Sequence, residues 1–110
     1  MPSVFKHSVV TQIGKTPVDV LQIPQGVRAT VIGCNIANIT EYDTVNVNVK
    51  IIDENSTEAV YVNSIPIPPN TALKLITQGE KLILPETAGI RINCDIDDSL
   101  DATISYVEIS

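Results

Sequence analysis

The stretch VNVNVKIID, residues 45–53, decides the fold class of this chain, because apolar and polar residues alternate through its first seven positions. Successive side chains of a β-strand point to opposite faces, so the three valines and Ile51 should share one face. The other face should carry Asn46, Asn48 and Lys50. The pattern predicts a strand with one face on a hydrophobic core, and it leaves open whether the polar face meets water, a ligand or another protein.

The rest of the chain has the composition of a β-protein. Valine and isoleucine dominate its apolar residues, tryptophan is absent, and the aromatic residues are three tyrosines and one phenylalanine. β-Branched side chains fit pleated, half-buried surfaces and lose rotamer freedom in helices. We therefore expect one domain over residues 1–110, an all-β, two-sheet antiparallel β-sandwich of about eight or nine strands with jelly-roll or immunoglobulin-like order. The expected strands are 5–13, 17–22, 27–39, 43–53, 58–65, 71–77, 80–84, 88–95 and 101–109.

Glycine and proline positions add local detail to this prediction. Gly33, inside VIGCNIAN, predicts a β-bulge or a close backbone approach. Pro66, Pro68 and Pro69 cannot donate hydrogen bonds within a sheet, so IPIPPNT should form an edge or a crossover between sheets. Gly79 argues for two strands joined by a turn rather than for one helix in this region.

Charge and hydropathy exclude several classes of partner. The chain has 13 acidic and 7 basic residues and a net charge of −6, so direct binding to nucleic acid or to an anionic membrane is not expected. No apolar run approaches the roughly 20 residues of a membrane-spanning helix. The N-terminal MPSVFKHSVV lacks the apolar segment of a signal peptide, so we expect synthesis in the cytosol. There Cys34 and Cys94 should be buried free thiols, although their spacing also fits an immunoglobulin disulfide.

The sequence offers little catalytic chemistry. His7 is the single histidine, and a hydrolytic triad would need a nucleophile and an acid to converge on it from elsewhere. We therefore expect no enzymatic activity and no cofactor. The run DIDDSLD could supply carboxylates to Ca²⁺, although it lacks the glycine and the terminal glutamate of an EF-hand loop. The candidate ligands are Asp95, Asp97, Asp98 and Asp101, and the alternative is a solvated turn between two strands.

Several segments, taken together, resemble the small β-rich virion structural proteins of tailed bacteriophages. They are IPQGVRATVIGCNIANIT, VNVNVKIID, VYVNSIPIPPNTALKL, QGEKLILPETAGIRI and ISYVEI, and they cover roughly residues 20–110. The shared pattern is a P-x-G opening before an apolar strand and N-x-A-N, the alternating valine strand, a proline crossover, a Gly-x-Lys-Leu-x-Leu hairpin and a final Ser-Tyr-Val-Glu-Ile. Its positions are Pro24, Gly26, Gly33, Asn35, Ala37, Asn38, Ile67, Pro68, Pro69, Asn70, Gly79, Lys81, Leu82, Leu84 and Ser105 to Ile109.

The resemblance implies a scaffold role. The expected function is that of a capsid decoration or cement protein, with a neck, tail or fibre-base protein as the alternative and a Ca²⁺- or carbohydrate-binding module as a further one. The implied partners are the major capsid protein or other virion proteins, and further copies of the chain, with a trimer favoured. The implied location is the virion, assembled in the host cytoplasm.

Residues 1–19 match this pattern least, and they are expected to form an arm or an extra strand that contacts a neighbouring subunit. Aromatic residues and arginine are enriched in the centres of protein interfaces. On that ground, and from the polar face of residues 45–51, the candidate interface residues are Arg28, Tyr42, Asn46, Asn48, Lys50, Tyr61 and Tyr106.

Overall fold

The computed structural model of the protein describes residues 3–76 and 82–109, and these form nine β-strands. The strands are β1 (Ser3–Ile13), β2 (Val18–Gln22), β3 (Arg28–Asn38), β4 (Val45–Ile52), β5 (Glu58–Ile67), β6 (Ala72–Ile76), β7 (Leu82–Leu84), β8 (Gly89–Cys94) and β9 (Leu100–Ile109). In that part of the chain no helix is long and apolar enough to cross a bilayer.

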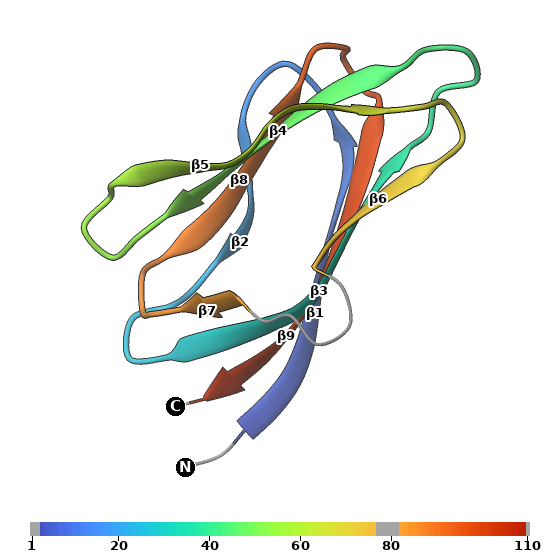
Figure 1. Cartoon of the computed structure of the whole chain (residues 1–110). Coiled ribbons are helices and arrows are strands. Elements are labelled where there is room, and N and C mark those ends of the chain that lie inside the picture. Colours follow the sequence, from blue (N-terminus) through green and yellow to red (C-terminus); the bar gives the residue numbers. More distant parts are fainter. Residues whose placement is uncertain (1–2, 77–81, 110) are drawn as a thin grey trace.

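The strands form two antiparallel sheets that pack as a sandwich (Figure 1). One sheet has the order β1-β9-β3, with β6 and β7 on the far edge of β3, and the other has the order β2-β8-β4-β5. The all-β two-sheet prediction is confirmed. Six of the eight connections between successive strands cross from one sheet to the other; β4 and β5 form a hairpin, and β6 and β7 follow one another along β3. If β6 and β7 count as one strand, the chain alternates between two four-stranded sheets except at that hairpin, which is jelly-roll order, whereas an immunoglobulin sandwich keeps three pairs of successive strands in the same sheet.

The alternating strand that defines the pattern lies inside the second sheet, as β4. Val45, Val47 and Val49 are fully buried, and Ile51 packs against the same core. Alternate residues of β3 and β9, such as Ile36, belong to the same buried cluster. The dry face of residues 45–51 is therefore the inner face of the sandwich, as the alternation predicts.

A β-bulge in β3 keeps both halves of that long strand in contact with the core. The pairing with β9 shifts register between Val31 and Gly33, so Ile32 is the extra residue. Before the bulge Val31 faces inward, and after it Cys34 and Ile36 do. Without the extra residue one half of the strand would turn its apolar side chains to solvent. The bulge predicted at Gly33 is confirmed.

The last strand settles which of its side chains face the core. Ala102 and Ile104 are buried, and Tyr106 packs against the core from the same face. Val107 and Ile109 lie on the outer face, because successive strand residues alternate. The inner face of β9 is therefore formed by Ala102, Ile104 and Tyr106.

The prediction that IPIPPNT forms an edge or a crossover between sheets is confirmed, because β5 is an edge strand and β6 belongs to the other sheet. Only the bounds of β5 differ. β5 runs through Pro66 to Ile67 instead of ending at residue 65, which an edge strand allows because one side of it needs no donor. β6 and β7 both pair antiparallel with β3, so they follow one another along one edge and do not form the expected hairpin. The turn predicted at Gly79 lies outside the described residues.

The N-terminal residues 3–13 form an integral strand of the sandwich. β1 pairs with β9 over nearly its whole length, and its other edge is the edge of the sheet. Between them, β1 and β2 take up most of residues 1–19, which the sequence assigned to an arm or an extra strand. A contact of this segment with a neighbouring subunit remains a prediction.

Two strand glycines should respond differently to a methyl group. A Cβ on Gly89 would lie 2.5 Å from the backbone oxygen of Leu21, whereas a Cβ on Gly33 would meet only the Ser105 Cβ at 4.0 Å. We expect Gly89→Ala to lower the free energy of unfolding by about 1–3 kcal/mol, because β2 must move away from β8. The matched Gly33→Ala should change it by less than about 0.5 kcal/mol. Urea denaturation of both variants checks this, and equal losses would contradict the close approach of β2.

Candidate functional site

The outer face of the four-stranded sheet is polar, and many of its polar side chains form hydrogen bonds or ion pairs within the chain. The backbone N–H of Asn46 donates to Asp95 Oδ1 at 2.9 Å, and its side-chain amide donates to Oδ2 at 2.8 Å. These hydrogen bonds, the backbone one first, hold the pKa of the Asp95 carboxyl below its ordinary value. The backbone N–H of Ser64 donates to Asn48 Oδ1 at 2.9 Å. The face predicted to meet water or a partner thus ties β4 to its neighbours.

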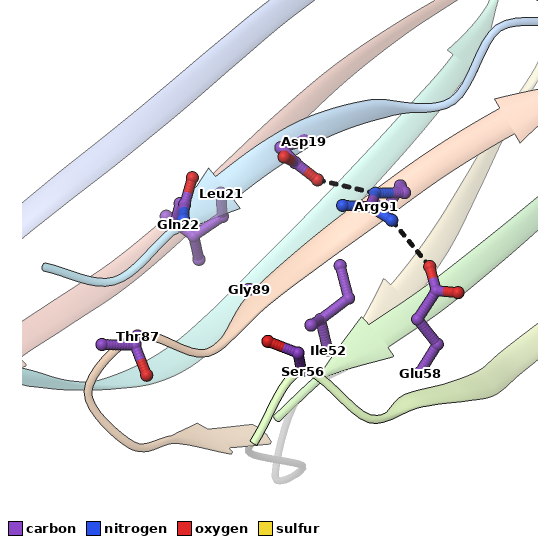
Figure 2. Close-up of a pocket in the computed structure, with 9 residues that line it drawn as sticks. All are labelled: Asp19, Leu21, Gln22, Ile52, Ser56, Glu58, Thr87, Gly89 and Arg91. Carbon is purple, nitrogen blue, oxygen red and sulfur yellow. Dashed lines mark hydrogen bonds and ion pairs between the residues drawn. The ribbon is translucent and has the colours of Figure 1, made fainter. Parts of the chain in front are cut away.

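A pocket of about 370 Å³ opens on this face (Figure 2). Arg91 lies between two carboxylates in it, 2.8 Å from Asp19 and 2.7 Å from Glu58. Because β2, β8 and β5 each supply one of these residues, the ion pairs link three strands. The other lining residues are Leu21, Gln22, Ile52, Ser56, Thr87 and Gly89. The pocket offers hydroxyl, amide and carboxylate groups to a small polar molecule, and none of its lining residues is a histidine that could activate Ser56.

The four acidic candidates for Ca²⁺ do not converge on one point. Asp95 accepts hydrogen bonds from Asn46, Asp97 from the backbone of Lys15, and Asp101 from the backbone of Gln12. Across residues 3–76 and 82–109, no group of three or more histidine, cysteine, aspartate or glutamate side chains could hold a metal ion. Asp95 instead ties the turn of residues 95–99 to β4, and Asp97 ties it to the loop of residues 14–17. Asp101 joins β9 to β1.

A buried asparagine organises the loop of residues 39–44, here called the Tyr42 loop. Asn38 is only 3% exposed, and its amide donates to the backbone oxygens of Asp43 and Ile67, both at 2.8 Å. Its Oδ1 accepts from the backbone and the hydroxyl of Thr40, at 2.9 and 2.7 Å. These hydrogen bonds hold the backbone of the loop in place, and Tyr42 on it is 86% exposed. The same burial keeps Asn38 from acting as the acceptor of its Asn-Ile-Thr sequon while the chain is folded.

A row of mostly apolar side chains crosses the outer face of the five-stranded sheet. The strand registers place Phe5 opposite Val107, Val107 opposite Thr30, and Thr30 opposite Ile83. Directly opposed residues lie on the same face of a sheet. Phe5 is 78% and Ile83 71% exposed, whereas the two residues between them are half-buried. We call these four residues the apolar row. It lies at the end of the sandwich where β1 begins and β9 ends (Figure 1).

The seven candidate interface residues do not form a single surface. Tyr42 is on its loop, Tyr61 is 41% exposed on the edge strand β5, and Arg28 is exposed at the start of β3. Asn46, Asn48 and Lys50 are half-buried on the outer face of the four-stranded sheet, and Tyr106 points into the sandwich. An interface role for any of them remains a prediction. The apolar row was not predicted, because it exists only through the pairing of four strands.

The remaining candidate groups for chemistry lie apart. His7 is exposed on β1, and within the described part of the chain no hydrogen bond joins its imidazole to an acid or a nucleophile. Cys34 and Cys94 are both free and buried, as the sequence predicts. Burial raises the pKa of the Cys34 thiol to about 11. The Cys94 Sγ lies 3.2 Å from the Ser99 hydroxyl.

Comparisons with known proteins support the fold only. The sequence matches no family model, and no curated protein matches it. Among solved structures, a chain from the Bacillus endospore appendages, which form a family of disulfide-linked pili, has a TM-score of 0.56 at 10% identity, covering 98% of this chain and 88% of that one. A chain of the infectious bursal disease virus Gt strain has a TM-score of 0.45 at 8% identity, covering 98% of this chain and 30% of that one. At such identities the likeness to the pilus subunit concerns the sandwich alone, and the viral match is too distant to support an argument.

Calcium should not stabilise this protein. An ion that binds only the folded state raises the melting temperature. Three of the four candidate carboxylates, those of Asp95, Asp97 and Asp101, already accept separate hydrogen bonds. We therefore expect thermal melts with and without millimolar Ca²⁺ to coincide. A rise in melting temperature that Asp98→Asn removes would instead restore the 95–101 segment as a metal site.

Removing the Asn38 side chain should destabilise the fold measurably. Asn38→Ala leaves the backbone groups of Ile67, Asp43 and Thr40 without these partners, so we expect a loss of about 1–3 kcal/mol in the free energy of unfolding. Asn35→Ala is the matched control, because Asn35 is half-buried on the same strand and makes no side-chain hydrogen bond within the described residues. Its loss should stay below about 0.5 kcal/mol. Similar losses for both variants would argue against the network.

Proposed function

We propose that this chain is a non-enzymatic structural protein of a tailed-bacteriophage virion, and within that class a capsid decoration protein that binds the assembled shell. The observation that carries the proposal is the exposed apolar surface. Phe5 and Ile83, the two ends of the apolar row, are 78% and 71% exposed, and Tyr42, at the opposite end of the sandwich, is 86% exposed. Large exposed apolar patches mark protein–protein contacts, and we propose that these side chains make such contacts.

The fold and the sequence resemblance each support the same proposal. Within the described residues, the motifs that resemble phage structural proteins extend from the β2–β3 loop to the end of β9, and Gly79 and Lys81 lie outside the described residues. The endospore appendage chain demonstrates that a sandwich of this shape can serve as the subunit of a pilus. Here both cysteines are buried within the sandwich, so the assembly we propose is non-covalent.

The partners in this proposal are the major capsid protein and further copies of the chain. A neck, tail or fibre-base protein is the alternative within the same class, because an exposed apolar surface would serve any of these positions. The two differ in stoichiometry, since a decoration protein repeats with the capsid lattice and a neck or tail protein does not.

The copy number of the chain in purified virions tests the proposal. We expect a ratio to the major capsid protein close to one or to a simple fraction of it, measured by quantitative mass spectrometry on virions of the phage that encodes the chain. A ratio corresponding to a handful or a few dozen copies would move the protein to the neck, tail or fibre base. Absence from purified virions would contradict the structural role.

A further inference from the structure

The charges next to the apolar row and next to the Tyr42 loop differ in sign. The loops at the end that holds the Tyr42 loop are residues 14–17, 39–44, 68–71 and 95–99, and together they hold five carboxylates and one lysine. The loops at the other end, residues 23–27, 53–57 and 85–88, hold three carboxylates, but the charged residue beside the apolar row on β3 is Arg28, two residues from Thr30 and opposite Ile109. Arg28 is exposed and makes no ion pair within residues 3–76 and 82–109. The complement of an apolar surface beside a cation is an apolar surface surrounded by acids.

The Tyr42 loop has this complementary character. Tyr42 and Ile39 are 86% and 46% exposed, and Glu41 and Asp43 flank the tyrosine. Because the Asn38 hydrogen bonds already fix the loop, little conformational entropy remains to be lost on binding. A rigid exposed tyrosine is the kind of side chain that dominates binding energy when it enters an apolar site.

The loop and the row cannot meet within one chain. Thr30, in the row, and Asn38, at the base of the loop, are eight residues apart on β3, which is roughly 26 Å along a strand. The molecule measures 47 Å along its longest axis and only 26 and 21 Å across it. Figure 1 shows the connection from β3 to β4, which includes the loop, at the opposite end from the start of β1 and the end of β9. Any contact between these two surfaces must therefore join two copies.

We propose that the Tyr42 loop of one copy docks on the apolar row of the next, with Tyr42 against Phe5 and Ile83 and with Glu41 or Asp43 near Arg28. The contact is heterologous, because different surfaces of the two copies meet. Each pair therefore leaves one loop and one row free, and the assembly grows as a filament or closes as a ring. A ring of three would be the trimer that the sequence resemblance implies. This inference builds on the proposed assembly function and names its homotypic contact.

Sedimentation velocity on the full chain, over a wide concentration range, tests the contact. We expect the wild type to self-associate reversibly, and less strongly as salt is added, because exposed charges are screened. Phe5→Ser and Tyr42→Ser should each weaken self-association at least about tenfold. Both side chains are exposed, so thermal unfolding of these variants should match the wild type. Val60→Ser is the matched control, because Val60 is 62% exposed on β5 and belongs to neither surface.

A mixing experiment distinguishes this contact from a symmetric one. The Phe5→Ser chain keeps its loop and the Tyr42→Ser chain keeps its row, so an equimolar mixture should form a dimer that cannot extend. A symmetric contact of row with row would leave the Tyr42→Ser chain self-associating alone. That result, a monomeric wild type, or a mixture without dimers would each overturn the inference.

Different results would contradict the proposed contact and the proposed virion role. A chain that self-associates in this way but is absent from virions would keep the contact and lose the virion role. A chain that is abundant in virions but monomeric in solution, and unaffected by both substitutions, would keep the virion role and lose the contact.

Discussion

The central strands of both sheets must bury one face and expose the other, and the rest of the structure follows from that constraint. A strand cannot bury its apolar side chains alone, so two sheets close on each other with Val47, Ile92 and Ile104 fully buried between them. Burying a valine or isoleucine side chain is worth about 1.5–3 kcal/mol. With side chains alternating at every residue, a slip of one position in any strand would remove that contribution along its length.

The longest strand meets this constraint only by breaking its own regularity. β3 pairs with β9 on one side and with β6 and β7 on the other, over 11 residues that no single alternation could keep in phase with the core. The bulge at Ile32 resets the phase, and Gly33 follows it where the outer face has room. The end of the same strand then supplies Asn38, whose amide closes the loop end of the sandwich. The same strand therefore packs in the core and holds the Tyr42 loop in place.

The outer surfaces have two different characters. On the four-stranded sheet, Asn46, Asn48 and Arg91 form hydrogen bonds or ion pairs with groups of the same chain, so these polar side chains already have partners. On the five-stranded sheet, Phe5 and Ile83 remain exposed beside half-buried neighbours. The first arrangement stabilises the sheet and the second is available to another protein. This contrast is why the proposed function is one of assembly, although the more obvious polar face first suggested a partner.

The sequence by itself determined the fold class, the two sheets and most strand positions, because period-two alternation is written in neighbouring residues. The strand expected at 43–53 is β4 at Val45–Ile52, and the one expected at 88–95 is β8 at Gly89–Cys94. It could not determine that β5 continues through Pro66 to Ile67, since an edge position is a property of the whole sheet. Nor could it identify the Asn38 network or the apolar row. Phe5 and Ile83 are 78 residues apart in the chain and share a row only because β9 and β3 lie between their strands. Local pattern decided which residues are buried; strand pairing over long sequence distances decided which exposed residues stand together.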